Sequence, residues 1–192
     1  LTGAAEVILA VEQLGRAYAD KRIVATVGKC DVINEAINIV PGLVELYVDV
    51  RGIDKDTVTE VVTKLYEEMG RIAEKRNLHI EPAVLGQETP VKLNDDMAEL
   101  LVEQCVPNRL TFLHMISGAG HDTMYMAELT RATMFFVPCL EGISHNKAEA
   151  VSDEAVQNGL KLMYSTLLRI CNLDPEEERE KEEMHRRFVE AM

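Results

Sequence analysis

The segment from Val44 to Arg51 alternates between apolar and polar side chains with a period of two, and no other pattern constrains the fold as much. Its members form an apolar set and a polar set: Val44, Leu46, Val48 and Val50, against Glu45, Tyr47, Asp49 and Arg51. Successive side chains of a β-strand point to opposite faces of a sheet, so this strand has one face to bury. A second layer must therefore cover that face.

Two helical patterns supply this layer. Residues 4–19 and 58–73 carry apolar side chains with the helical period of 3.6, and Asp54 or Asp56 can cap the second helix. Short strands are expected at Ile23–Gly28 and His79–Leu85. With one more strand expected before residue 1, this half predicts a two-layer domain with both helices on one face of a sheet.

The connection into the alternating strand contains Val40-Pro41-Gly42-Leu43, which suits a type II turn. A tight hairpin there would place Asn38 opposite about Glu45, with Arg51 about 20 Å further along the strand. One small ligand cannot contact both residues in that arrangement. Either residues 34–42 curl back, or Asn38 and Arg51 serve different sites across a dimer.

A turn-rich break at Gly86–Pro90 predicts a boundary, with domains at residues 1–88 and 89–192. The second domain alternates helices with short apolar strands, expected at Leu110–Met115 and 133–138, which favours α/β layering with a mostly parallel sheet flanked by helices. Ser152 caps its long helix. A polar tail helix is expected from about residue 174.

Charge and cysteine content limit the expected binding partners and the expected cellular compartment. The chain has 20 Lys and Arg against 33 Asp and Glu, a net charge of −13, which disfavours nucleic acid and anionic membranes as partners. The four cysteines are scattered in apolar contexts, without a CxxC pair: Cys30, Cys105, Cys139 and Cys171. We expect them to be reduced thiols in the core of a cytoplasmic protein.

Two of the five histidines, His121 and His145, lie in turns that come after apolar segments expected to be buried strands. Ligands of open α/β sheets collect at the carboxyl ends of the strands, so both histidines lie where a site belongs. Motifs for a single-helix zinc site, a nucleophilic serine, a dinucleotide or a phosphate loop are absent from the sequence. On residue type alone, His145 remains a metal ligand, a general base or a surface loop residue.

Four short motifs in a fixed order carry a resemblance to a known family. They are NIVPG at 38–42, VDVRG at 48–52, SGAGHD at 117–122 and MFFVPCLEGISHNKAE at 134–149. Together they resemble the metal-dependent amidohydrolases of the M20 peptidase clan, in the branch that cleaves ureido compounds: allantoate amidohydrolase, N-carbamoyl-L-amino-acid hydrolase and β-ureidopropionase. The chain departs from this branch at Lys147, where proline is usual.

The resemblance implies roles for individual residues. His145 matches the last ligand of a pair of divalent metal ions, zinc or manganese. Asn38 and Arg51 match residues of the family's lid domain that hold the substrate, and Gly120 and His121 match the loop that lines its pocket. The implied substrate is a ureido acid, such as allantoate or an N-carbamoyl amino acid, whose amide C–N bond is hydrolysed with release of ammonia.

The same resemblance implies that much of the site is missing. The other metal ligands and the general-base glutamate are expected upstream of residue 1, so no catalytic residue is assigned and the metal site is incomplete. Residues 1–88 then correspond to the lid, which we expect to form a homodimer through its edge strand. His79-Ile80-Glu81 and Glu182-Glu183 are similar to upstream family segments but lie in the wrong context.

We therefore expect a C-terminal portion of an amidohydrolase, inactive by itself. Two alternatives stay open: a non-catalytic module for dimerisation or binding, and a related M20 aminoacylase or peptidase. The sequence does not select the ureido substrate or the metal.

Overall fold

The computed structural model describes residues 1–172, 179–180, 183–184 and 186–187. The chain divides into two compact units, Leu1–Pro90 and Val91–Met192, and each is described by itself. Both helices and strands are present, and the expected class of mixed α and β structure is confirmed. Among the described residues, no helix is long and apolar enough to cross a membrane.

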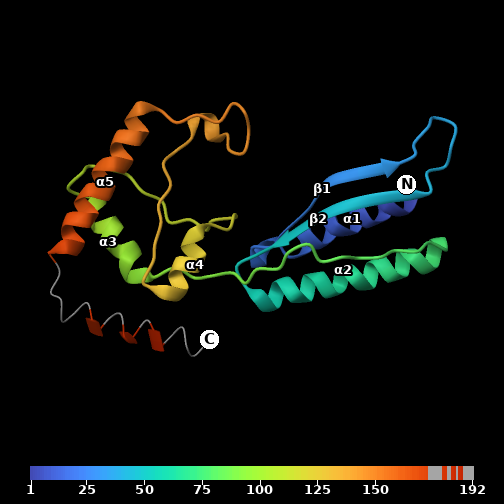
Figure 1. Ribbon diagram of the computed structural model, residues 1–192, viewed down its shortest axis with the longest axis horizontal. Coiled ribbons are helices and arrows are strands. Elements are labelled where there is room, and N and C mark those ends of the chain that lie inside the picture. The colour runs from blue at the N-terminus through green and yellow to red at the C-terminus, as the bar shows by residue number, and fades with distance from the viewer. Residues whose placement is uncertain (173–178, 181–182, 185, 188–192) are drawn as a thin grey trace. The chain divides into compact units, whose positions relative to one another are not determined.

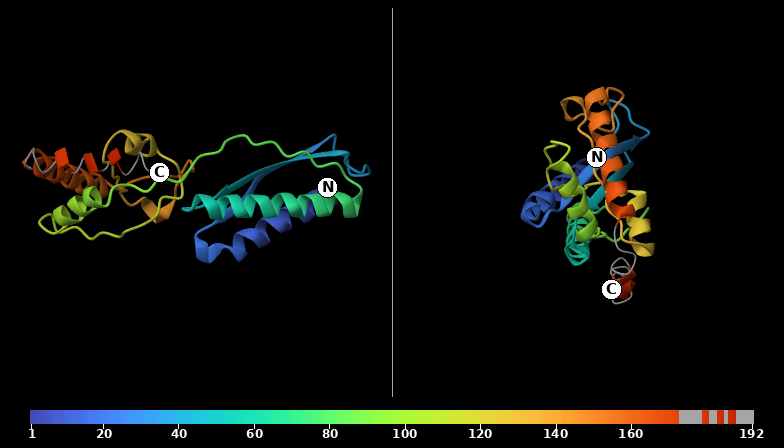
Figure 2. Two further views of the ribbon diagram at one scale, coloured as in Figure 1. Left: turned by 90° about the horizontal axis from the view of Figure 1, so that it is seen from below. Right: turned by 90° about the vertical axis from the view of Figure 1, so that its left-hand side faces the viewer.

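The first unit is a two-stranded antiparallel sheet with two helices along one face (Figures 1 and 2). Its elements are α1 (Thr2–Ala17), a short 3-10 turn (Ala19–Lys21), β1 (Val24–Ile33), β2 (Leu43–Arg51) and α2 (Lys55–Arg76). In β2, Val44, Leu46 and Val50 are partly buried and the polar set is exposed, as the alternation predicts, whereas Val48, predicted on the buried face, is 39% exposed.

The β1–β2 connection differs from the expected tight turn. Pairing runs from Val24 opposite Arg51 to Ile33 opposite Leu43, with a bulge between Val27 and Lys29, so residues 34–42 form an open loop. The type II turn was wrong, because glycine at its third position needs a positive φ and Gly42 does not have one. The turn in this loop instead comes earlier, where the Ile39 amide donates to the Ala36 carbonyl at 3.2 Å.

The core of the first unit is made where the helices meet the sheet. One cluster contains Val7, Ala10 and Ile72, with Leu46 packed against it. The other contains Tyr18, Ile23 and Val61, with Val50 packed against it. Ile72 and Val61 are 1% and 0% exposed, so α2 contributes the most completely buried side chain of each cluster.

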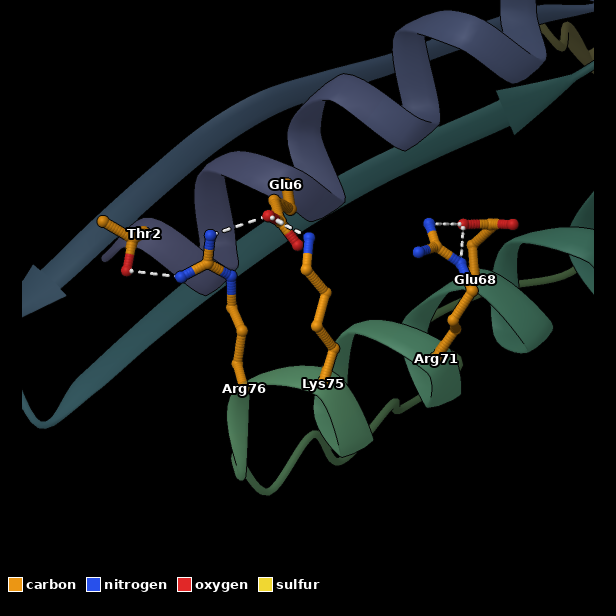
Figure 3. A network of polar contacts seen from close by, with 6 residues as sticks. All are labelled: Thr2, Glu6, Glu68, Arg71, Lys75 and Arg76. Carbon is orange, nitrogen blue, oxygen red and sulfur yellow. Dashed lines mark hydrogen bonds and ion pairs between the residues drawn. The ribbon is translucent and has the colours of Figure 1, made fainter.

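Short-range signals and an ion-pair network position α2. Asp54 is its N-cap, since its carboxylate accepts from the Thr57 amide at 2.8 Å. At the other end, the Glu6 carboxylate of α1 accepts from Arg76 at 2.6 Å and from Lys75 at 3.0 Å (Figure 3). These bonds, Arg76 first and Lys75 second, lower the pKa of Glu6 to about 2. The network ties the start of α1 to the end of α2.

The second unit contains α3 (Asp95–Cys105), α4 (Asp122–Leu129), a 3-10 turn (Leu140–Gly142) and α5 (Asp153–Cys171). Asn94 caps α3 and Ser152 caps α5, each accepting a backbone amide hydrogen bond. Helices α3 and α5 pack together, and Asn108 donates to Ser165 Oγ at 2.9 Å. Buried Cys105 lies in this unit's core.

The strands expected in the second unit are not formed among the described residues. Residues 110–115 and 133–138 are without strand assignment, and only an isolated bridge, Cys139 to Val151, is present there. Residues 79–85 of the first unit are likewise not a strand. A β-strand exists only through hydrogen bonds to a neighbouring strand, so a sequence that favours extended backbone is insufficient without a partner. The expected parallel sheet is therefore absent from the described part of the chain.

The expectations for the cysteines and for the C-terminal tail have different outcomes. All four cysteines are free thiols, as expected, but only Cys105 is buried: Cys139 is partly exposed, and Cys30 and Cys171 are exposed. The core location was thus wrong for three of them, because an apolar neighbourhood in sequence does not fix which way a side chain faces. The polar tail helix from about residue 174 falls largely outside the described residues.

Candidate functional site

His145 lies in a loop that is closed at its base. The Cys139–Val151 bridge and a 2.8 Å hydrogen bond from the Leu140 amide to the Ala150 carbonyl join the two ends. His145 itself has left-handed backbone, with φ of 55°, and its side chain is exposed. Its amide donates to Glu149 Oε2 at 2.8 Å. In the described part of the chain, its imidazole has no hydrogen-bond partner, so both ring nitrogens remain available to a ligand.

A turn that begins at Asn146 forms the next part of this loop. The Glu149 amide donates to the Asn146 carbonyl at 3.0 Å, and Asn146 Oδ1 accepts from the Ala148 amide at 3.0 Å. Lys147 occupies the second position of this turn, where proline is favoured. The departure at Lys147 is therefore compatible with the turn.

The SGAGHD segment forms the entry to α4. Ser117 Oγ donates to the Ala119 carbonyl at 2.8 Å and accepts from the Ala119 amide at 3.3 Å, which closes the turn. Gly120 is exposed, and His121 is the N-cap residue of α4 without a side-chain capping bond. The His121 ring lies 5.5 Å, centroid to centroid, from the ring of Phe136. Two motif segments far apart in sequence are thus neighbours in the second unit.

Asn38 and Arg51 are far apart within one chain. Asn38 is exposed in the 34–42 loop, beyond the start of β2, whereas Arg51 is the last residue of β2. The eight steps from Leu43 to Arg51 span about 27 Å at the usual rise of an antiparallel strand. The loop that carries Asn38 therefore joins β2 at the end opposite Arg51. Arg51 Nε also pairs with Asp49 Oδ2 at 3.2 Å.

The described residues do not build a metal site by themselves. They contain no group of three or more His, Cys, Asp and Glu side chains able to hold an ion. No hydrogen bond or ring contact joins His121 to His145 in this part of the chain. His79 and Glu81 approach each other at 3.7 Å, but both are almost fully exposed and have no third donor. Among the described residues, His145 therefore has no companion donors, whereas a catalytic zinc site needs at least three protein ligands.

Glu149 was missed by sequence reasoning. It stands four residues after His145, outside the residues singled out, yet it holds the His145 amide. The signal was present in the HNKAE spacing, because a turn at Asn146 brings the fourth residue back toward the first. However, a side chain that accepts a hydrogen bond from a backbone amide leaves no periodic pattern in the sequence, so periodicity could not identify Glu149.

Comparison with known proteins decides the family. The family model described as "Peptidase family M20/M25/M40" matches residues 3–169. The chain belongs to this family. This agrees with the resemblance drawn from the four motifs.

Individual M20 relatives are similar over most of the chain. It is 31% identical over 169 residues to an N-carbamoyl-L-amino-acid amidohydrolase of Pseudomonas sp. (strain NS671), covering 88% of the chain and 41% of that relative. It is 30% identical over 149 residues to the allantoate amidohydrolase of Escherichia coli (strain K12), covering 78% of the chain and 36% of that relative. Most of each relative thus lies outside the match.

The fold agrees with solved structures. A crystal structure of AtUAH in complex with (S)-hydroxyglycine superposes with a TM-score of 0.80 at 32% identity, covering 88% of this chain and 40% of that one. The chain therefore spans about two fifths of the length of the M20 proteins it matches.

Proposed function

We propose that the chain provides the lid and the C-terminal part of the catalytic domain of a metal-dependent amidohydrolase that cleaves the amide C–N bond of a ureido acid and releases ammonia. The observation that carries this proposal is the match over residues 3–169 to the M20 family together with relatives named for N-carbamoyl amino acids and allantoate. The nature of the reaction and the substrate both come from these relatives.

His145 is the residue we propose as a metal ligand. The M20 family is generally metal-dependent. The exposed imidazole of His145 has no hydrogen-bond partner in the described part of the chain, so a ring nitrogen is free to bind a metal ion. Since the described residues offer too few donors for a complete site, the remaining ligands and the general base are proposed to lie in a part that corresponds to the uncovered length of the relatives. Two divalent ions, zinc or manganese, would polarise the scissile carbonyl there.

The remaining residues are proposed to hold the substrate. Arg51 would bind the substrate carboxylate through its guanidinium, which matches a carboxylate with two parallel hydrogen bonds. Asn38 would bind an amide group, and Gly120 and His121 would line the pocket. Because β2 spans about 27 Å from Leu43, next to the Asn38 loop, to Arg51, we propose that Asn38 and Arg51 serve different active sites of a homodimer formed through the lid.

The surface of the second unit supports an incomplete domain. Its long helix α5 buries Ala155 and Leu162 but leaves large apolar side chains exposed: Val156, Leu160, Met163, Tyr164, Leu167 and Leu168. A contiguous exposed apolar surface on this scale is unusual for a finished soluble domain. The chain alone is therefore expected to be inactive, and the missing part of the domain is expected to cover this surface.

Ammonia release tests the proposal. The complete gene product, with the upstream part expected from the relatives, should hydrolyse N-carbamoyl amino acids or allantoate, and the 192-residue chain should not. Ureido hydrolysis by the isolated chain would contradict the incomplete site. Activity on N-acetyl but not N-carbamoyl amino acids would identify an aminoacylase or peptidase instead. A gene product without any upstream part and without hydrolysis would leave a module for binding or dimerisation.

Mixing inactive variants tests the dimer. If each site takes Asn38 from one subunit and Arg51 from the other, a heterodimer of Asn38→Ala and Arg51→Ala chains has one intact site. An equal mixture of the two, exchanged to equilibrium, should then regain about a quarter of wild-type activity, because half of the dimers are mixed and each has one working site. No recovery would show that Asn38 and Arg51 of one subunit serve the same site, and a monomeric mass would exclude the dimer.

A further inference from the structure

Glu149 lies at the centre of the loop that presents His145. Its carboxylate accepts a hydrogen bond from the His145 amide, from Oε2 at 2.8 Å, and its own amide donates to the Asn146 carbonyl at 3.0 Å. One residue thus contacts the backbone on both sides of the His145–Asn146 peptide bond. A hydrogen bond to an ionised carboxylate is stronger than one between neutral groups.

The backbone of His145 needs such a restraint. A φ of 55° is left-handed, a conformation that costs free energy for any residue with a Cβ atom and that glycine adopts freely. Histidine persists there only when its surroundings hold it. The side chain of His145 is exposed and has no hydrogen-bond partner in the described part of the chain, so its imidazole provides no restraint. The restraint comes from Glu149 and the Asn146 turn.

We propose that Glu149 is a positioning residue: it fixes the backbone of His145 so that the imidazole is presented outward as a ligand. This inference rests on the proposed role of His145 in metal binding. Glu149 acts through the backbone, which leaves both ring nitrogens free. The loop closure at Cys139–Val151 anchors the segment, and Glu149 sets the direction of the histidine within it.

The first experiment needs no metal. Amide hydrogen exchange of His145 is measured by NMR in the 192-residue chain. Glu149→Ala should speed exchange about tenfold, the effect of losing one hydrogen bond to a charged group. Glu149→Gln keeps an acceptor oxygen and should restore most of the protection. Glu141→Ala is the matched control, because it removes a carboxylate from the same loop that makes no hydrogen bond in the described structure. Unchanged exchange in Glu149→Ala would overturn the inference.

The second experiment measures zinc binding by the complete gene product at a defined free Zn²⁺ concentration. Glu149→Ala should weaken binding about tenfold, as the loss of an outer partner of a metal ligand does. Glu149→Gln and Glu141→Ala should bind like wild type, and His145→Ala should lose more than Glu149→Ala. If His145→Ala binds zinc normally, the proposed metal role of His145 fails. If His145→Ala loses zinc and Glu149→Ala does not, the positioning role of Glu149 fails while the proposed function stands.

Discussion

Gly70 and Gly159 each lie inside a long helix, and replacing each with alanine is expected to change the free energy of unfolding in opposite directions. Alanine is favoured over glycine in a helix interior by about 1 kcal/mol. At Gly70, in α2, an added Cβ meets no heavy atom within 4 Å. Gly70→Ala should therefore stabilise the first unit by nearly the whole of this amount.

At Gly159, in α5, the same methyl group meets the extended segment that passes over the helix. The added Cβ would lie 2.7 Å from Val137 Cγ1 and 3.5 Å from Phe135 Cε2. Since the first distance is well inside van der Waals contact, α5 and the 133–138 segment must separate. Overpacking of this kind costs about 1–3 kcal/mol, more than the gain of about 1 kcal/mol from helix propensity. Gly159→Ala should therefore destabilise the second unit, by up to about 2 kcal/mol.

Urea unfolding followed by circular dichroism measures both effects. The cost of Gly159→Ala should shrink in a Val137→Ala background, because the clashing γ-methyl group is then gone. Amide signals of α2 and α5 assign each transition to its unit. If Gly159→Ala stabilised the chain as much as Gly70→Ala, the 133–138 segment would not pack on α5 as described, and the account of the second unit would be wrong.

Three further predictions concern the core, a titrating group and the His145 loop. Ile72→Ala should lower the free energy of unfolding, measured in urea, by about 2–5 kcal/mol. The same change at fully exposed Ile37 should alter it by less than about 0.5 kcal/mol. Because the pKa of Glu6 is lowered from 4.5 to about 2, its contribution to stability is complete above pH 4.5 and is lost as the pH falls toward 2. In Glu6→Gln, the free energy of unfolding should therefore depend less on pH over that range. An unchanged pH profile would contradict the network. Lys147→Pro, at the second turn position, should raise stability by about 0.4–1 kcal/mol, whereas a loss would show that the turn around Asn146 is formed differently.

Local signals in the sequence predicted the first unit well. The alternation at Val44–Arg51 identified both a strand and the face that it buries. The helix starts at Asp54, one of two candidate caps, and at Ser152 were found by the same rule, because a capping side chain acts on an amide only two or three residues away. The predicted hairpin turn was wrong because nine residues separate the paired ends of the two strands. The connection is therefore not a tight turn, and Gly42 does not need a positive φ.

The strands of the second unit show where local reasoning ends. Leu110–Met115 favours extended backbone, but a ladder needs a partner whose position no local pattern encodes. Leu113 and Met115 are accordingly 81% and 65% exposed, although their composition predicts burial. In a matching M20 protein of known structure, the matched part is only 40% of the chain, so that protein has further chain beyond the match.

The candidate site divides along the same line. Its residues were predicted as types through a resemblance, yet the resemblance carried no geometry. The hairpin places Asn38 and Arg51 towards opposite ends of β2, and the described residues contain no group able to hold a metal ion. What the chain does complete on its own is the immediate support of one residue. The Cys139–Val151 closure, the Asn146 turn and Glu149 surround His145 with contacts made within thirteen residues. Because these contacts are all local, the geometry of the loop around His145 should be retained in any variant that keeps them.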